Sequence, residues 1–499
     1  MTYLGIDIGT SGVKALLIDR AGRPLGEATA KSVEPVRPHP GWSEQNPADW
    51  WSATLEAVDK LGKSNPGELA KVRGIGLSGH MHGATLLDRD DRVLRPCILW
   101  NDGRAAAECA EMEAALPALR DTAGNIAMPG FTAPKLAWVR KHEPEIFAKL
   151  AKVLLPKAYI RLLLSGEHIE EMSDASGTLW LDVRRRDWSD ELLALTGLTR
   201  AHMPSLVEGS APAGRLKREL RERWGMSGDV VIAGGAGDNA AAACGIGAIR
   251  PGEGFVSLGT SGVIFVSNAQ FSPNTSGAVH AFCHAIPDTW HQMGVILSAT
   301  DSLNWLARIT GQDPARLSTA AEAGYRGPGE EIFLPYLSGE RTPHNNAAAR
   351  GSFTGLSHST TPALLAQAVM EGVAFAFRDC QRVLGDAGTN FSRLLAVGGG
   401  SKSELWLKLI ATNLDIEVAL PEDGDFGGAL GVARLGLCAA EGADPAEVMT
   451  MPASRRVITP DRALSARYTD QYARYRALYP AIEDARERAV DPAIEEARK

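Results

Sequence analysis

The stretch Gly9-Thr10-Ser11-Gly12-Val13 stands between two apolar runs, residues 3–8 and 13–19. The same five residues recur as Gly259-Thr260-Ser261-Gly262-Val263, again between apolar runs. A Gly-Thr-Ser-Gly turn between strands offers backbone N–H groups, small hydroxyls and glycines that tolerate positive φ, which suits a phosphate-binding nest. Two copies in one strand context predict a duplicated fold with a nucleotide between the halves. The alternative is a pair of unrelated tight turns, because Gly-rich hairpins share this composition.

Short apolar runs alternate with helical stretches along the chain, and this alternation predicts an α/β fold. Asn46-Pro47-Ala48-Asp49 has the composition of a helix start. The tyrosines at 468, 472, 475 and 479 recur at helical spacing and predict a packing face, with Pro480 expected to end that helix. The strand-like runs lie at 3–8, 13–19, 73–78, 230–234, 255–258, 263–267, 331–334 and 394–397.

Length and composition indicate a large enzyme with ordinary globular chemistry. A chain of 499 residues is long enough for two cores, with a boundary expected near 244–254. The net charge of −8 argues against nucleic acid or an anionic membrane surface as the main partner, and no apolar run approaches the length of a membrane span. The six cysteines are scattered without a CxxC pair, and the N-terminus does not resemble a secretory signal. We therefore expect reduced thiols and a cytoplasmic location.

Two segments have the residue types that bind a small polyhydroxylated ligand. Residues 77–85 form a strand end that opens into a polar turn with Met81 and His82. Residues 98–104 place Trp100, Asn101 and Asp102 together, so a ring can cover C–H faces while the amide and acid bind hydroxyls. The alternative for Asp102 is a cap on the Ala-rich helix that follows.

A third segment, residues 233–241, places Asp238 after a Gly-rich turn and before a run of alanines. As a plain helix cap this carboxylate needs no further explanation. In the sequence it lies between the two Gly-Thr-Ser-Gly turns, the first and second hydroxyl turns, and just before the domain boundary expected near 244–254. This place favours a catalytic role. A zinc cluster of His280, His284 and His291 is the less favoured interpretation, because no second ligand pair accompanies them.

Two longer segments carry a family resemblance. Residues 130–142, Gly130-Phe131-Thr132-Ala133-Pro134-Lys135-Leu136-Ala137-Trp138-Val139-Arg140-Lys141-His142, resemble the first signature of the FGGY carbohydrate kinases. Residues 351–356 with 366–371 resemble the second, although Leu364 stands where the family usually has a polar residue. The chain is thus similar to this family of the sugar-kinase/actin/chaperone ATPase superfamily up to about residue 440.

Within the family, the chain most resembles the members that phosphorylate D-xylulose. This resemblance rests on residues 37–45, 79–85, 99–104 and 337–346, with His80 where those members commonly have Gln. It implies ATP-dependent conversion of D-xylulose to D-xylulose 5-phosphate in xylose metabolism. The alternatives are a kinase for another pentulose or a polyol, or a non-metabolic actin-like or chaperone-like ATPase, which would not need the sugar segments.

The resemblance implies two duplicated ribonuclease-H-like domains of the actin/hexokinase ATPase type, with a central cleft. Residues 1–245 would form the domain with the sugar site, the first phosphate loop and the catalytic acid. Residues 254–440 would form the domain with the second phosphate loop and the adenosine loop. Residues 441–499 would be a helical extension packed on the body. A homodimer is plausible on the same resemblance.

The resemblance also implies individual roles. Asp238 would be the general base that accepts the proton of the attacking sugar hydroxyl, and Asp7 would orient Mg²⁺. Mg²⁺ keeps several waters and needs few carboxylates, so one acid suffices. The ATP phosphates would be held by Thr10, Ser11, Lys14, Gly259, Thr260 and Ser261. The adenosine loop would be Gly399, Gly400, Ser401 and Lys402. The ketose pocket would be lined by Met81, His82, Trp100, Asn101, Asp102 and Asp238.

Overall fold

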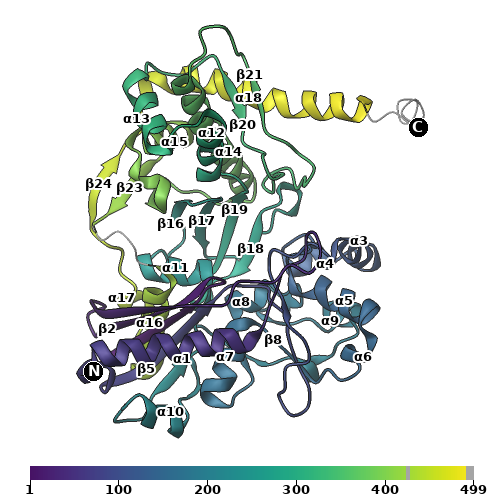
Figure 1. Cartoon of the computed structure of the whole chain (residues 1–499), viewed down its shortest axis with the longest axis vertical. Helices are drawn as coiled ribbons and strands as arrows, with labels where there is room; N and C mark the ends of the chain where they lie inside the picture. The colour runs from purple at the N-terminus through teal and green to yellow at the C-terminus, as the bar shows by residue number, and fades with distance from the viewer. Residues whose placement is uncertain (423–426, 490–499) are drawn as a thin grey trace.

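The computed structural model describes residues 1–422 and 427–489, and it divides into two lobes that each contain a seven-stranded mixed sheet (Figure 1). In the described part of the chain, no helix is long and apolar enough to cross a membrane. The six cysteines are all buried and none forms a disulfide.

The first sheet is built around an N-terminal hairpin. Strand β1 (Thr2–Ile8) pairs antiparallel with β2 (Gly12–Asp19), so the first Gly-Thr-Ser turn joins them. β2 continues to β3 (Pro24–Lys31), while β1 pairs in parallel with β5 (Val72–Gly79) on its other side. β5 then pairs in parallel with β14 (Val231–Ala233). The edge strand β13 (Pro212–Arg215) and the short β15 (Ala236–Gly237) complete the sheet.

The second sheet repeats this order of strands. β16 (Gly254–Leu258) pairs antiparallel with β17 (Gly262–Asn268) through the second Gly-Thr-Ser turn. β17 continues to β19 (Trp290–Ile296), and β16 pairs in parallel with β22 (Arg393–Val397), which pairs in parallel with β23 (Glu417–Pro421). The edges are β18 (His280–Cys283) and β24 (Ser454–Ile458). The repeated order confirms the predicted duplicated fold.

Helix α1 (Pro47–Ser64) covers one face of the first sheet, and α16 (Gly427–Glu441) covers the other. Side chains of β1 alternate between them: Leu4 and Ile6 belong to the core beneath α1, whereas Tyr3 packs with α16. Gly76 of β5 lies where any Cβ would overlap the Val432 carbonyl of α16, so helix and sheet approach through glycine. As predicted, Asn46 caps α1, its side chain accepting from the Ala48 N–H.

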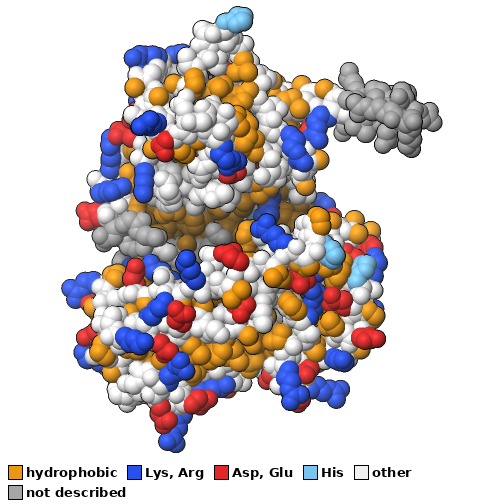
Figure 2. Space-filling model, in the orientation of Figure 1, with side chains coloured by type: hydrophobic (Ala, Val, Ile, Leu, Met, Phe, Trp, Pro, Cys, Tyr) orange, Lys and Arg blue, Asp and Glu red, His pale blue; other side chains and the backbone are white. Residues whose placement is uncertain are grey.

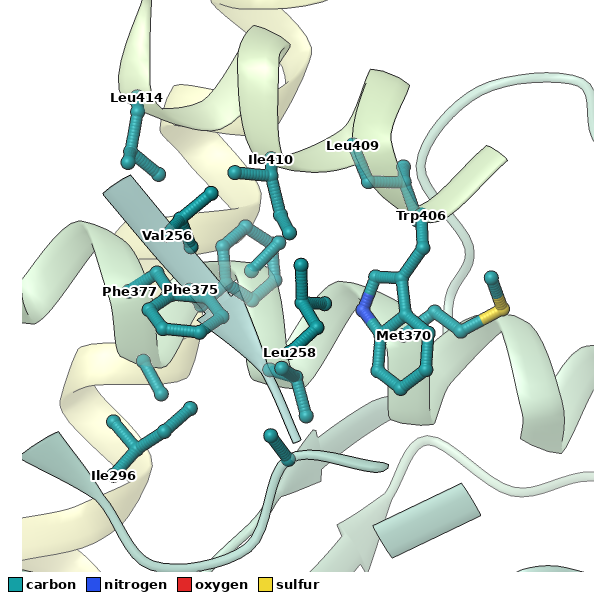
Figure 3. Packing of buried hydrophobic residues seen from close by; sticks show 14 of the residues in the cluster. Val256, Leu258, Ile296, Met370, Phe375, Phe377, Trp406, Leu409, Ile410 and Leu414 are labelled. Carbon is teal, nitrogen blue, oxygen red and sulfur yellow. The ribbon is translucent and has the colours of Figure 1, made fainter. Parts of the chain in front are cut away.

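The second lobe packs two helices against its sheet. Val256 and Leu258 of β16 meet Phe375 and Phe377 of α14 (Pro362–Asp386) and the residues of α15 (Glu404–Leu414), as Figure 3 shows. These side chains are almost fully excluded from solvent, so the apolar area that they bury stabilises the lobe.

Residues 441–499 were expected to be a helical extension, but they also include β24, which pairs with β23. The last helix is α18 (Arg462–Ala489). The prediction that Pro480 ends it is wrong, because Pro480 lies inside α18. A proline removes only one N–H donor, so packing of the preceding turns can carry the helix past it.

The tyrosine stripe on α18 is a packing face, as predicted. Tyr468 and Tyr475 are buried beside Phe375 of α14. Their hydroxyls find polar partners inside the lobe: Tyr468 donates to Glu371 at 2.9 Å, and the Tyr475 and Tyr336 hydroxyls lie 2.9 Å apart.

Candidate active site

The first hydroxyl turn leaves its backbone donors available. Gly9 N–H donates to the Gly12 carbonyl at 2.9 Å and closes the turn. Within the described residues, the Thr10 and Ser11 N–H groups donate to no protein acceptor. Indole Nε1 of Trp100 donates to the Thr10 hydroxyl at 3.3 Å and so joins this turn to the predicted sugar segment. The turn therefore keeps the donors that a phosphate group needs.

Asp7 lies near the end of β1, next to the turn. Its Oδ1 accepts from the Ser78 hydroxyl of β5 at 2.7 Å, and the neighbouring strand places Ser78 opposite it. Burial raises the pKa of Asp7, although Ser78 and Lys14 oppose the shift. Gly428, in the first turn of α16, lies so close that a Cβ there would sit 3.1 Å from Asp7 Oδ1. Four elements thus converge on this carboxylate.

Lys14, which was expected to contact the phosphates, forms an ion pair within the protein. Its ammonium lies 2.9 Å from Glu27 of β3, and its side chain is 29% exposed. It stands directly across from Asp7 in the β1–β2 pair. The structure therefore places Lys14 next to the metal-site candidate but in an ion pair with another partner.

The second hydroxyl turn lies beside the predicted adenosine loop. A Cβ on Gly398 would come within 3.2 Å of the Gly259 nitrogen, so only glycine permits this approach at its φ of 87°. The Gly259 and Thr260 carbonyls accept the N–H groups that begin α12 (Thr300–Thr310). The Thr260 and Ser261 N–H groups, like those of the first turn, have no acceptor in the described part of the chain.

A cavity of about 450 Å³ opens beside this second turn. Gly399, Gly400 and Lys402 of the predicted adenosine loop line it. Ser401 does not line it, and its hydroxyl instead donates to the Gly398 carbonyl at 2.7 Å. Trp406 of α15 and residues of α12 and α13 (Pro314–Gly324) form the remaining wall, which no motif in the sequence marked.

The predicted sugar loop, residues 79–85, packs against Gly237, the residue before Asp238. Met81 is buried, and its sulfur lies where a Cβ on Gly237 would meet it at 2.9 Å. His82 has a positive φ of 70°, and its Nδ1 lies 2.7 Å from the Gly177 carbonyl. A carbonyl only accepts, so Nδ1 carries the proton. Burial lowers the pKa of His82 to about 3. The ring is therefore neutral, with Nε2 as an acceptor.

The three polar residues of the second sugar segment have different surroundings. Trp100 is 47% exposed beside the phosphate turn, and Asn101 is exposed next to it. Asp102 is buried, and its oxygens already accept from the Ser43 N–H at 2.6 Å and from the Arg104 side chain at 2.7 and 2.9 Å. Asp102 thus anchors the turn through Arg104. It is not the cap of α3 (Ala106–Ala115), whose N-cap is Ala105.

Asp238 is the first residue of α11 (Asp238–Ile246), the helix that lies between the lobes (Figure 1). Its Oδ1 accepts from the Asn239 backbone and side chain at 2.6 and 2.8 Å. The carboxyl reaches solvent, yet protein surrounds it on most sides. This burial raises the pKa of Asp238 to about 6, Asn239 opposes the shift, and the nearby charge of Asp7 adds to it. A carboxylate with such a pKa suits proton transfer near neutral pH.

A hollow separates the two lobes on the face that Figure 2 shows. The first turn, Asp7, the sugar loop and Asp238 belong to the lower lobe, and the second turn with the adenosine cavity belongs to the upper lobe (Figure 1).

Two other clusters contain residue types that can bind metals. His280, His284 and His291 do not form a metal-ligand group, and the only such group among the described residues is Glu170, Glu171 and Asp174. The Lys157 ammonium already lies 2.9, 2.8 and 3.4 Å from these three acids. A cation of the protein itself therefore already lies among these three buried acids.

The two lobes, each with a mixed sheet of the same strand order, have the α/β fold of the actin-like ATPases. Residues 2–245 match the FGGY family of carbohydrate kinases, N-terminal domain, and residues 254–440 match the C-terminal domain of the same family. The chain belongs to the FGGY family of carbohydrate kinases.

Several relatives are similar over nearly their full length. Xylulose kinase of Escherichia coli (strain K12) is 47% identical over 481 residues, which cover 96% of this chain and 98% of that protein. A crystal structure described as a xyloylose kinase from Brucella ovis has a TM-score of 0.95 and 57% identity, and covers 97% of this chain and 100% of that one. Xylulose kinase from Rhodospirillum rubrum has a TM-score of 0.90 and 29% identity, with 97% and 99% covered.

Proposed function

We propose that the protein transfers the γ-phosphoryl group of ATP to D-xylulose and forms D-xylulose 5-phosphate and ADP. The full-length similarity to xylulose kinases supports the choice of sugar. The observation that carries the chemistry is the carboxylate of Asp238, whose pKa is raised to about 6 and whose neighbour in the chain, Gly237, packs against Met81 of the sugar loop.

In this mechanism the sugar rests against Met81, His82 and Trp100. Asp238 accepts the proton of the O5 hydroxyl while O5 attacks the γ-phosphorus, and the bond from that phosphorus to the β–γ bridging oxygen breaks, so ADP leaves. Phosphoryl transfer needs in-line positioning and charge stabilisation more than covalent help. Donors from both hydroxyl turns supply that stabilisation around the phosphates.

The residues around Asp7 fit a Mg²⁺ ion. Asp7 offers one carboxylate whose Oδ2 makes no hydrogen bond in the described part of the chain, and Mg²⁺ keeps several waters alongside one or two carboxylates. When bound with ATP, the ion would neutralise charge on the phosphates. Lys14 would then act as a nearby positive charge, weakened by its pairing with Glu27.

The adenosine moiety would occupy the 450 Å³ cavity beside Gly399 and Gly400. The glycines let the backbone approach the ligand, and Lys402 can reach it from the rim. A homodimer remains our expectation from the family resemblance, and light scattering on the purified protein tests it.

The test is an ADP-release assay with D-xylulose, other pentuloses, xylitol and glycerol. We expect the highest kcat/KM for D-xylulose, and only a slow background without sugar. A higher kcat/KM for another pentulose or a polyol would replace D-xylulose as the substrate and leave the kinase assignment intact. ADP release that no sugar accelerates would contradict the kinase function itself. The D238N variant, run in parallel, identifies background from contaminating ATPases.

A further inference from the structure

A five-residue helix, α8 (Met172–Ser176), lies directly behind the segment that carries Asp238. The Gly237 N–H, one residue before Asp238, donates to the Ser173 hydroxyl oxygen at 3.0 Å. Both groups are buried. Through this hydrogen bond, α8 contacts the turn that precedes Asp238.

The Ser173 hydroxyl is itself fixed from behind. It donates to Glu171 Oε1 at 2.7 Å, and the Ser173 N–H donates to Glu171 Oε2 at 2.7 Å. The Lys157 ammonium, on α7 (Pro156–Ser165), donates to the same Oε1 at 2.8 Å. Burial alone would raise the pKa of Glu171, but Lys157 and the Ser173 donors hold it below its ordinary value. Glu171 is therefore a charged acceptor, and the hydroxyl hydrogen points toward it.

The hydrogen bonds through Ser173 all donate in one direction. Because the Ser173 hydroxyl hydrogen is committed to Glu171, its oxygen lone pairs face Gly237. Arg161, one helical turn after Lys157 on α7, donates to the Ala233 carbonyl at 3.4 Å and also to the Gly234 carbonyl. The turn before Asp238 is thus tied at its start by Arg161 and at its end by Ser173.

We propose that Ser173 is a positioning residue for the reaction: through the Gly237 N–H it fixes the backbone from which the Asp238 carboxylate reaches the sugar hydroxyl. The inference rests on the proposed role of Asp238 as the base. Without the hydroxyl, a buried N–H loses its acceptor and the turn can shift to find another. A displacement of about 1 Å at a reacting group can cost roughly 100-fold in rate.

The test variant is Ser173→Ala, and Ser176→Ala is the matched control. Ser176 is equally buried in the same helix, and its hydroxyl donates to the Met172 carbonyl at 2.8 Å and accepts from the Cys283 N–H at 3.0 Å. Each variant removes one buried hydroxyl, but only Ser173 contacts the turn before Asp238. We expect kcat to fall about 10-fold or more in Ser173→Ala, with KM for ATP unchanged and the Ser176→Ala kcat within twofold of the parent enzyme.

A double variant separates positioning from loss of structure. If Ser173 acts through Asp238, Ser173→Ala should lower kcat no further in the D238N background, because the positioned group can no longer accept a proton. A further 10-fold fall there, or equal kcat values for Ser173→Ala and Ser176→Ala, would overturn the inference. If Ser173→Ala does not fold, Ser173→Cys keeps the volume with a weaker acceptor and should show the same pattern. Failure of the parent enzyme to phosphorylate any sugar would instead reject the proposed function.

Discussion

Asp238 and Asp7 are the two acids proposed for the active site, and their surroundings differ. Asp238 reaches solvent and has a raised pKa of about 6, whereas Asp7 is held by Ser78 and faces the first turn of α16. The first arrangement suits a group that gains and loses a proton, and the second suits a group that stays fixed beside phosphates.

For Asp238, we expect the Asp238→Asn variant to lose about 10²–10⁴-fold in kcat, with ATP binding little changed, because an amide cannot accept the proton. The parent enzyme needs the ionised carboxylate. Since its pKa is raised to about 6, kcat/KM for D-xylulose should increase as pH rises through 6 and fall below it. Steady-state kinetics across this pH range measure the effect. An unchanged profile in the variant, or turnover within a few-fold of the parent, would remove Asp238 as the base.

For the phosphate side, Asp7→Ala should lower kcat more than it weakens sugar binding, because the carboxylate acts on the transferring group through the metal. Lys14→Ala should be milder, since backbone donors share the phosphate charge and Lys14 already pairs with Glu27. Glu27→Gln is the control, because it releases Lys14 without removing it. Kinetics at several Mg²⁺ concentrations test the pair. Equal losses in Asp7→Ala and Lys14→Ala would contradict this division of roles.

For Asp102, the residue types nearby in the sequence did not predict which groups its carboxylate contacts. Its neighbours suggested a ligand for sugar hydroxyls, yet its oxygens are satisfied by Ser43 and Arg104. Ser43 lies 59 positions away in the chain, so no local pattern reveals this contact. Ser173 and Glu171 could not be predicted from the sequence for a similar reason. A serine near a glutamate is not a recognisable motif, and only the fold brings Gly237 to Ser173.

At the scale of elements, repeated turns and short apolar runs predicted the two hairpins and the strands β5, β14 and β22 beside them. The edge strands β3 and β24 were not predicted, and neither were β19 and β23, which lie inside the second sheet. β3, for example, reads Pro-Leu-Gly-Glu-Ala-Thr-Ala-Lys and is mostly exposed, so its pattern carries little apolar signal. β24 is also an edge strand and is mostly exposed, with two adjacent arginines before its two apolar residues. Such strands are defined by the neighbour they pair with.

Gly76 is the element-scale contact that we expect to be least tolerant of change. In Gly76→Ala the new Cβ would overlap the Val432 carbonyl, so α16 and β5 must separate, at a cost of roughly 3 kcal/mol or more. The control is Gly385→Ala in α14, where a Cβ meets no atom within 4 Å and helix propensity favours alanine. Urea unfolding of both variants measures the difference. Equal stabilities would show that the helix and sheet can move apart freely.

For the whole molecule, the two hydroxyl turns belong to different lobes. We therefore predict that the lobes close on each other when ligands bind. In the proposed mechanism ATP and sugar would meet across the hollow of Figure 2, and closing it would expel the water that competes with O5. Water cannot fill the contacts offered by Met81, His82 and Trp100, so it should drive closure poorly. We expect slow ATP hydrolysis alone, faster phosphoryl transfer with D-xylulose, and a smaller radius of gyration by small-angle scattering with sugar bound. The same radius with and without sugar would contradict closure.

The packing of α16 on the first sheet has a consequence for how the protein is made. Residues 427–441 cover β1 and β5, strands that leave the ribosome long before them. Until α16 emerges, the face of the sheet around Tyr3 and Gly76 has no cover, so the first lobe cannot finish folding on its own. The second lobe is synthesised in the interval and has its own core of β16, α14 and α15. The lobe that is synthesised first therefore completes its folding last. A chain cut before residue 427 should require chaperones.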